Sequence, residues 1–406
     1  MTTAAANSLV ARSESILHGL EQAGELKHLQ TIEGPMGPTV ELRMADGSVK
    51  EVVCLCSNNY LGLADHPEVV EAGIEGLKKY GAGTASVRFI CGTFEAHHRI
   101  EARIAEMLGV EASYTFVSCW NASEALFPTL ATPDDAIVSD ALNHACIIDS
   151  IRLAGVIQKG IGKFIYPNND MGAFEEKLKA ARASVADDAV VWVVTDGVFS
   201  MEGSIAELPT MRRLCDEYRA VLVVDDSHGT GVMGETGRGT HEHYGMAGAD
   251  VDLFTGTLGK ALGGGAGGYI AGPKPVVDMI VQRGRPTLFS NALPATVACS
   301  ADKAIEILMR EPERVQRLRD NVAYARQKIK AVGFDVIDSP TAICPVIVGE
   351  TSKAISMSKR LLDLGVYVIG FGYPVVPEGE ARLRCQISAA HTREHIDHLA
   401  DALAKL

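Results

Sequence analysis

The stretch at residues 255–268, TGTLGKALGGGAGG, is the part of the sequence from which the fold can be inferred. It places Lys260 between threonine hydroxyls and a run of glycines, and the strand-like Tyr269-Ile270-Ala271 follows. Glycines let a backbone approach a ligand closely, and hydroxyls beside an amine suit an anionic group. Lys260 is therefore a solvated surface lysine, part of a nucleotide-binding loop, or a lysine that forms an imine with a carbonyl cofactor in a site that lowers its pKa.

The nucleotide-binding interpretation depends on Gly263-x-Gly265-x-x-Gly268, which formally matches GxGxxG. A dinucleotide fingerprint follows a strand and opens a helix, whereas this run leads into a strand-like segment. A dinucleotide-binding oxidoreductase would also place its glycines at the first strand–helix turn, which this sequence does not do. The imine interpretation instead predicts a carboxylate at an upstream strand end, a residue that stacks on a ring, and a separate phosphate cradle.

The composition is that of a soluble globular protein with two or three packed units. The chain has 406 residues, of which 47% are hydrophobic and 22% charged. Its net charge of −13 argues against nucleic acid or an anionic membrane as the main partner. No apolar run approaches the ~18–20 residues of a membrane span, and the N-terminus lacks the basic start and apolar block of a secretion signal. Nine cysteines without CxxC pairs indicate reduced thiols in the cytoplasm, rather than disulfides or a metal site.

The first 60 residues predict an arm with little core of its own. Residues 8–30 have the periodicity of an amphipathic helix, and a hairpin follows at 39–44 and 49–55. We expect this arm to lie on another part of the molecule or on a second subunit. Further helices are predicted at 66–80 and 94–109.

Residues 61–291 predict a large α/β domain, and residues 292–406, entered after Pro294, predict a smaller α+β domain. Short apolar runs alternate with helical stretches in the large domain, and several runs lack the polar alternation of a strand with one wet face. This pattern predicts a mainly parallel sheet of seven strands, with ligand chemistry at their carboxyl ends. The predicted strands are residues 114–117, 136–138, 163–166, 190–194, 221–224, 251–254 and 268–271.

Polar residues follow five of these strands. The turn at 118–121 follows the first strand, His144 comes soon after the second, Asp196 and Ser200 follow the fourth, Asp225 and His228 follow the fifth, and Lys260 follows the sixth. Each has an ordinary structural explanation, since His144 or Asp225 could simply cap a helix. Together, however, polar groups at five strand ends would converge on one crevice.

This set of residues suits pyridoxal phosphate. Lys260 would hold the aldehyde as an imine, and Asp225 would keep the ring nitrogen protonated so that the ring acts as an electron sink. His144 would stack on the ring, while His228 and Ser200 would form hydrogen bonds with its hydroxylate. The phosphate would bind at the start of a helix. The groups that suit it are the backbone N–H groups of Cys119 and Trp120 and the hydroxyls of Thr255 and Thr257.

Eight stretches resemble the α-oxoamine synthases, a subgroup of the fold-type-I pyridoxal phosphate enzymes. They are CSNNYLGLADHPE (56–68), ASVRFICGT (85–93), IVSDALNHACIID (137–149), TDGVFSMEG (195–203), VVDDSHGTGVMGE (223–235), TGTLGKALGG (255–264), LFSNALP (288–294) and YPVVPEGEARLRCQISAAHT (373–392). They extend over nearly the whole chain, so the resemblance concerns its full length. VDDSH with TGTLGKALGG is specific to the family, whereas RFICGT and LFSNALP favour its glycine C-acetyltransferase branch, the 2-amino-3-ketobutyrate CoA ligases.

The resemblance implies a reaction and further site residues. Enzymes of this branch condense glycine with acetyl-CoA to 2-amino-3-oxobutyrate and CoA, and run in reverse in threonine degradation. By resemblance, Lys260 also removes the α-proton of glycine, and Ser290 reaches the phosphate of the cofactor in the neighbouring subunit of a homodimer. Asn58 and Arg384 would hold the substrate carboxylate. A guanidinium can match a carboxylate with two parallel hydrogen bonds, although Arg382-x-Arg384 alone would suggest a surface ion pair.

One motif departs from the family pattern, which is close to Cys-Phe-Asp-Ala-Asn. Here the residues are Cys119-Trp120-Asn121-Ala122-Ser123, followed by Glu124. Backbone groups can still bind the phosphate, but the larger Trp120 and the added Glu124 can reshape the acyl pocket. An alternative is therefore a related synthase that uses another small amino acid or a longer acyl-CoA, for example in secondary metabolism. A catalytically silent partner subunit is disfavoured, because such subunits tend to lack the lysine that Lys260 supplies.

Overall fold

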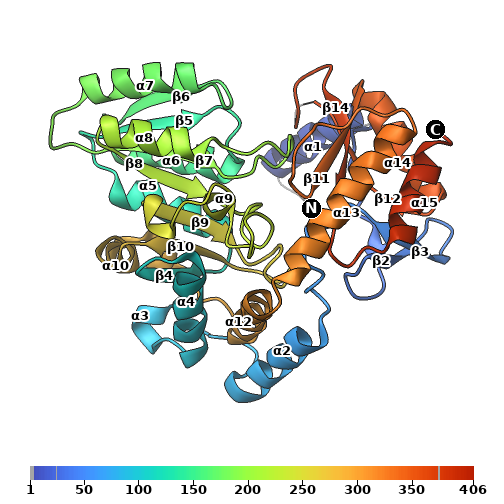
Figure 1. Ribbon diagram of the computed structural model, residues 1–406, viewed down its shortest axis with the longest axis horizontal. Coiled ribbons are helices and arrows are strands. Elements are labelled where there is room, and N and C mark those ends of the chain that lie inside the picture. Colours follow the sequence, from blue (N-terminus) through green and yellow to red (C-terminus); the bar gives the residue numbers. More distant parts are fainter. Residues whose placement is uncertain (1–3, 24, 374) are drawn as a thin grey trace.

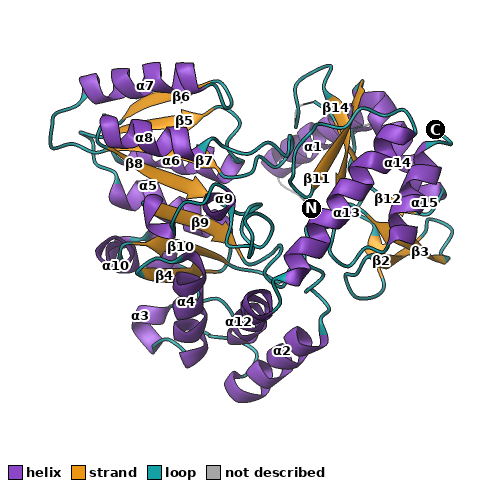
Figure 2. Ribbon diagram, in the orientation of Figure 1, coloured by secondary structure: helices purple, strands orange, loops and turns teal. Residues whose placement is uncertain are grey.

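The computed structural model describes residues 4–23, 25–373 and 375–406, and its largest sheet has seven strands (Figure 1, Figure 2). The strand order is β4-β10-β9-β8-β7-β5-β6. The strands are β4 (Ala112–Phe116), β5 (Ala136–Asp140), β6 (Gly162–Tyr166), β7 (Val191–Asp196), β8 (Ala220–Asp225), β9 (Leu253–Thr257) and β10 (Gly268–Gly272). All neighbours from β6 to β9 are parallel, while β10 is antiparallel to both β9 and β4. The prediction of a mainly parallel, seven-stranded sheet is confirmed.

Helices cover both faces of this sheet, which explains why its strands lack polar alternation. On β8, Leu222 and Val224 belong to one apolar cluster, and Val223 between them belongs to the other. One face carries α4 (Glu95–Leu108), α7 (Met171–Ser184) and α8 (Leu208–Glu217), and the other carries α5 (Cys119–Leu130), α6 (Ala145–Ile157) and α10 (Lys274–Arg283). Because both faces are covered, a ligand reaches this sheet at the ends of its strands.

Three helices pack together beside the large sheet, namely α2 (Pro67–Tyr80), α4 and α12 (Ala295–Arg310). The hydroxyl of Thr296 on α12 donates to the carbonyl of Gly73 on α2 at 2.7 Å. Although α12 follows the predicted domain boundary at residue 292, it thus lies against the predicted large domain, and the boundary stays a prediction. Short helical turns complete this part of the chain: α3 (Arg88–Cys91), α9 (Thr240–His243), η1 (Gly248–Asp250) and α11 (Arg285–Phe289).

The C-terminal part of the chain is built around a three-stranded antiparallel sheet, to the right of the large sheet in Figure 1. Its order is β11-β14-β13, so β14 is the central strand. The elements are α13 (Glu313–Ala331), β11 (Ile343–Gly349), α14 (Thr351–Asp363), β13 (Ile369–Phe371), β14 (Ala381–Gln386) and α15 (Arg393–Leu403). Within the described ranges, no helix is both long and apolar enough to cross a membrane.

A second sheet joins the N-terminal arm to the C-terminal part. Its order is β1-β2-β3-β12, formed by β1 (Thr31–Ile32), β2 (Thr39–Arg43), β3 (Val49–Cys54) and β12 (Val366–Tyr367). β2 and β3 are the predicted hairpin, and β3 pairs in parallel with β12. The helix predicted at 8–30 is too long, because α1 spans Ala4–Gln22. Leu29 beyond it is 95% exposed, so the leucine periodicity there has no core to bury it.

Candidate active site

A cavity of about 200 Å³ lies at the carboxyl ends of β7, β8 and β9. Its walls are formed by Cys119, Trp120, His144, Cys146, Asp196, Val198, Asp225, Ser227, His228, Thr257 and Lys260. Seven of the predicted site residues are in this wall, so the edge of the sheet assembles the crevice that the sequence predicts.

Lys260 lies on the loop between β9 and β10, and its amine meets His228. The Nζ atom of Lys260 is 2.9 Å from Nε2 of His228. Burial lowers the pKa of Lys260, and burial, with a smaller effect of the nearby amine, lowers the pKa of His228 well below its usual value. Burial thus disfavours the charged form of both side chains, and an amine that loses its proton more easily can act as a nucleophile or a base.

Asp225 is the last residue of β8 and is 4% exposed. Its Oδ1 accepts a hydrogen bond from the backbone N–H of Ser227 at 3.0 Å, and its Oδ2 lies 3.6 Å from the thiol sulfur of Cys119. Neither partner is a cation. The carboxylate is therefore available to pair with a protonated ring nitrogen in the cavity.

The start of α5 offers backbone N–H groups to an anion. Ser118 caps the helix, and its Oγ accepts a hydrogen bond from the N–H of Asn121 at 3.2 Å. The first N–H groups of a helix have no partner within the helix and carry a positive partial charge. β10 comes very close here, because a Cβ at Gly268 would lie 2.3 Å from the backbone nitrogen of Cys119. Thr257 is in the same wall, where its hydroxyl donates to the carbonyl of Gly267 at 3.2 Å.

His144 is both a helix cap and part of the cavity wall, and its stacking on the cofactor ring stays a prediction. It caps α6, because its Nδ1 accepts a hydrogen bond from the N–H of Cys146 at 3.2 Å, and its ring also lines the cavity. The ring of Trp120 stands edge-on to it, with 6.5 Å between the ring centroids. A planar ligand would therefore meet an aromatic wall on this side of the cavity.

Asp196 uses one carboxyl oxygen to bind the backbone of His144, and its other oxygen has no hydrogen-bond partner in the described structure. Its Oδ2 accepts a hydrogen bond from the backbone N–H of His144 at 3.1 Å, whereas its buried Oδ1 has no partner within the described residues. Burial, and then the nearby Asp225, raise the pKa of Asp196 well above its usual value. An unpaired buried oxygen beside a cavity is expected where a ligand completes the hydrogen bonding.

These groups fit pyridoxal phosphate. They supply an amine for its aldehyde, a carboxylate for its ring nitrogen, an aromatic wall for its plane and a helix start for its phosphate. A metal fits less well, since the described parts of the chain contain no group of three or more His, Cys, Asp or Glu side chains that could hold one.

A second cluster joins the cavity at His228. The Oη of Tyr60 lies 2.8 Å from Nδ1 of His228. When the side-chain amide of Gln386 is oriented to satisfy its neighbours, it donates to Oδ1 of Asn58 at 2.6 Å and accepts from Nη1 of Arg384 at 3.1 Å. The structure thus brings Asn58 and Arg384, which are far apart in the sequence, to the same side of the cavity.

Arg384 is buried on β14, and part of its guanidinium has no hydrogen-bond acceptor in the described structure. It is 8% exposed, and its Nε has no partner in the described structure. Arg382 makes the ion pairs instead, at 3.3 Å with Glu202 and 3.1 Å with Glu380. The surface ion-pair interpretation of Arg384 is therefore wrong. Burial lowers the pKa of Arg384, and a buried guanidinium with unused donors favours an anionic ligand.

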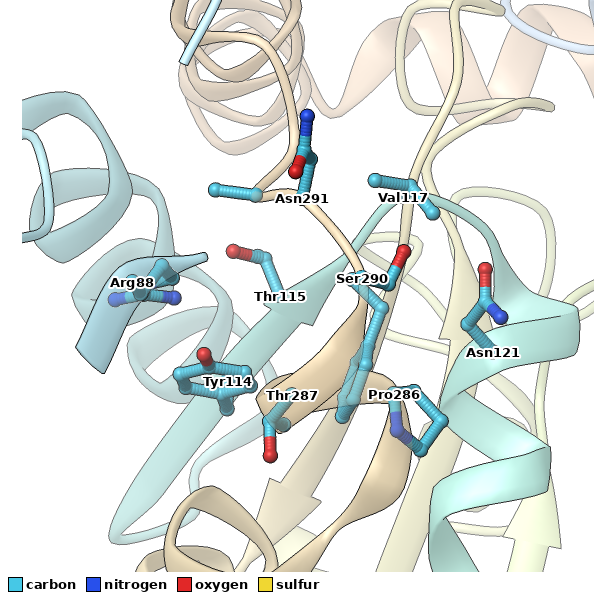
Figure 3. A pocket seen from close by; sticks show the side chains of 11 residues that line it. Arg88, Tyr114, Thr115, Val117, Asn121, Pro286, Thr287, Ser290 and Asn291 are labelled. Atoms are coloured by element: carbon cyan, nitrogen blue, oxygen red, sulfur yellow. The ribbon is translucent and has the colours of Figure 1, made fainter. Parts of the chain in front are cut away.

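Four predicted residues lie outside the cavity wall: Asn58 and Arg384, which belong to the cluster around His228, and the serines Ser200 and Ser290. Ser200 is partly buried in the turn that follows Val198, which does line the cavity. Ser290 borders a separate recess, shown in Figure 3, where it lies near Val117 and Asn121. The structure does not bring either serine to Lys260, and their roles stay predictions.

Five further residues line the cavity or contact its wall without a role assigned from the sequence: Tyr60, Cys146, Asp196, Val198 and Ser227. Asp196 and Ser227 follow predicted strands, so their position could have indicated them. Tyr60 gave no such signal, because it meets His228 only through the tertiary fold, 168 residues away in the sequence.

Comparison with known proteins places the chain in one family. The model of a family described as aminotransferase class I and II matches residues 50–403. A 2-amino-3-ketobutyrate coenzyme A ligase of Salmonella typhimurium is 46% identical over 366 residues, which are 90% of this chain and 89% of that protein. A mitochondrial protein of the same name from Mus musculus is 43% identical over 393 residues, 97% of this chain and 91% of that protein.

The solved structure of Sphingomonas wittichii serine palmitoyltransferase has the same fold, with a TM-score of 0.86 at 28% identity. The similarity covers 98% of this chain and 96% of that one. The predicted fold-type-I transferase fold and the resemblance to the α-oxoamine synthases are both confirmed. The chain belongs to the aminotransferase class I and II family and, within it, to the α-oxoamine synthases that include the 2-amino-3-ketobutyrate coenzyme A ligases.

Proposed function

We propose that this chain is a pyridoxal phosphate-dependent acyltransferase that condenses glycine with acetyl-CoA to 2-amino-3-oxobutyrate and CoA. The reaction is reversible, and its reverse direction serves threonine degradation. The observation that carries the proposal is the buried amine of Lys260, which lies in one cavity with Asp225 and the start of α5. The similarity to 2-amino-3-ketobutyrate coenzyme A ligases supports glycine and acetyl-CoA as the substrates.

Each side chain has a task that its position favours. Arg384 and Asn58 hold the carboxylate of glycine, Asp225 pairs with the ring nitrogen of the cofactor, and the start of α5 binds its phosphate. When bound, the cofactor supplies an electron sink for the charge that develops on the α-carbon of glycine. Lys260 takes the α-proton on Nζ, and burial, which lowers the pKa of this amine, favours the form that can accept it.

The bonds and protons of the reaction balance with these groups alone. The α-carbon of glycine forms a bond to the carbonyl carbon of the thioester, and the carbon–sulfur bond of acetyl-CoA breaks. The CoA thiolate leaves and takes up the proton that Nζ of Lys260 accepted from the α-carbon. His228, at 2.9 Å from Nζ, keeps the lysine amine oriented toward the reacting atoms.

We also propose a homodimer with the active site at the interface. Exposed apolar side chains support it: Phe89 and Ile90 on α3 are 63% and 66% exposed, and Phe289 on α11, which contacts α3, is 72% exposed. Phe289 immediately precedes Ser290, so a second subunit on this surface would bring Ser290 near the partner's cofactor. A cytoplasmic location is proposed from the nine cysteines, which are all free thiols.

Spectroscopy and product analysis test the function together. Purified protein loaded with pyridoxal phosphate is titrated with glycine while its visible absorption is recorded, and then acetyl-CoA is added and free CoA is quantified by chromatography. We expect a spectral change with glycine and stoichiometric CoA release, both absent from Lys260→Ala. A response to serine or alanine but not glycine, or to longer acyl-CoA only, would favour the related synthases, as the likeness to serine palmitoyltransferase allows. No visible band at all would refute the proposal.

A further inference from the structure

A line of hydrogen bonds runs from the N-terminal arm to Lys260. Tyr60, just after β3, is 1% exposed, and its Oη lies 2.8 Å from Nδ1 of His228. The other ring nitrogen of His228, Nε2, lies 2.9 Å from Nζ of Lys260. Tyr60 is not part of the cavity wall, and of the side chains it contacts, His228 is the one that lines the cavity.

The direction of these hydrogen bonds follows from the neighbours of Tyr60. The amide nitrogen of Gln386 donates to Oη of Tyr60 at 3.2 Å and to Oδ1 of Asn58 at 2.6 Å. Oη has a single proton to give, and its two possible acceptors are Oδ1 of Asn58 at 3.3 Å and Nδ1 of His228 at 2.8 Å. The Asn58 oxygen is farther away and already accepts from Gln386. The proton of Tyr60 is therefore donated to Nδ1 of His228.

Burial keeps the His228 ring neutral, because it lowers the pKa of the imidazole well below its usual value. The nearby Lys260, Arg384 and His144 also oppose a second proton on the ring. Burial raises the pKa of Tyr60 to about 12, so the phenol stays protonated and remains a donor. A neutral imidazole whose Nδ1 accepts a hydrogen bond carries its one proton on Nε2.

We propose that Tyr60 is a positioning residue that fixes His228 in the tautomer with its proton on Nε2, so that this N–H faces the cavity. In the loaded enzyme, on which the proposed function depends, the N–H would donate to the ring oxygen of pyridoxal phosphate and stabilise its anionic form. With the other tautomer, a lone pair would face that oxygen and repel it. Tyr60 thereby determines whether His228 presents an N–H or a lone pair to the cavity, although Tyr60 itself lies outside the cavity wall.

The tautomer is measured directly by the ¹⁵N chemical shifts of the two ring nitrogens of His228, with signals assigned by their loss in His228→Gln. Protein loaded with pyridoxal phosphate is used, because a charged Lys260 amine has no lone pair and could only donate to Nε2 in the cofactor-free protein. The result needs bound cofactor but no turnover, so it is distinguishable from a failure of the proposed function. We expect a protonated Nε2 in the wild type and a mixture of tautomers in Tyr60→Phe. Tyr269→Phe is the matched control, because Tyr269 is also buried and donates one hydrogen bond, to Thr230 at 3.2 Å.

The loaded protein gives a second readout. Loss of a fixed donor to the ring oxygen should raise the pH midpoint of the visible absorption change by about 0.5–1 unit in Tyr60→Phe and leave it unchanged in Tyr269→Phe. Thermal unfolding should shift somewhat more in Tyr60→Phe than in Tyr269→Phe, because Tyr60 also accepts a hydrogen bond from Gln386. A proton on Nδ1 in the wild type, or a Tyr60→Phe protein with wild-type nitrogen shifts, would overturn the proposal. Absence of turnover with glycine and acetyl-CoA would instead count against the proposed function.

Discussion

Replacing Gly268 with alanine should weaken cofactor binding through contact with the start of α5. A Cβ at this position would lie 2.3 Å from both Cα and the backbone nitrogen of Cys119. Because real Cβ atoms essentially never approach closer than 3.0 Å, the two segments must separate by at least 0.7 Å, the difference between 3.0 and 2.3. Both contacted atoms belong to the backbone, so no side-chain rotation can relieve the overlap.

The size of the effect follows from two terms. Overpacking of this kind costs about 1–3 kcal/mol of folding free energy. A hydrogen bond from a backbone N–H to a charged phosphate contributes about 1.5–3 kcal/mol, and displacement of the helix start should remove most of at least one such bond. Since about 1.4 kcal/mol corresponds to a factor of ten, the dissociation constant of pyridoxal phosphate should rise roughly 10- to 100-fold.

Titration of the cofactor-free protein with pyridoxal phosphate, followed by visible absorption, measures this constant. Gly265→Ala is the matched control on the same loop, because the nearest atom to its Cβ would be Cγ1 of Val297 at 3.4 Å, an ordinary contact. Thermal unfolding of both cofactor-free variants separates a global loss of stability from a local one. Equal cofactor affinity in Gly268→Ala, Gly265→Ala and the wild type would refute the inference that this close approach shapes the phosphate site.

Three further changes test other parts of the molecule. Lys260→Ala should abolish covalent retention of pyridoxal phosphate, and a borohydride-stable adduct found by mass spectrometry at another lysine would contradict this role. Arg384→Lys keeps the charge but loses the planar pair of donors, so the KM for glycine in steady-state kinetics should rise about 10- to 100-fold while cofactor affinity is unchanged; an unchanged KM would disprove the carboxylate role. Burial lowers the pKa of His391 to about 4. Below the pKa that this histidine has in the unfolded chain, the unfolded state therefore binds a proton that the folded state does not. The free energy of unfolding should fall by about 2 kcal/mol between pH 7.5 and 5 for this reason. Urea unfolding of His391→Gln should therefore depend less on pH than the wild type, whereas the exposed-site control His28→Gln should match it.

The sheet and most of its functional edge could be predicted because their signals are local. A strand that helices cover on both faces is apolar along its length. A polar residue at its end, such as Asp225 at the end of β8, indicates where the strand leaves the apolar core. The helix after β4 was equally visible, since Ser118 is a capping residue. Such features need only a few neighbouring residues to be recognised.

Features that depend on pairing between distant segments could not be predicted in the same way. The composition around Arg384 is typical of an exposed strand, yet β14 is enclosed by β11 and β13 and Arg384 is buried. The contact between Tyr60 and His228 likewise arises only after two sheets are assembled side by side. The predicted extent of the first helix was wrong at both ends, because α1 begins at Ala4 and ends at Gln22, and periodicity alone does not mark where a helix stops.

The pairing of β3 with β12 also sets an order of events while the chain is being made. Val53 and Val366 are partners across this ladder, so 313 residues separate them, which is 366 minus 53. At a synthesis rate of about 5–20 residues per second, a ribosome needs roughly 15–60 s to cover that distance. The residues from Cys119 to Lys260 that surround the cavity emerge well before β12 does. A nascent chain therefore passes through a period in which every residue of the cavity wall has been made but Arg384 has not.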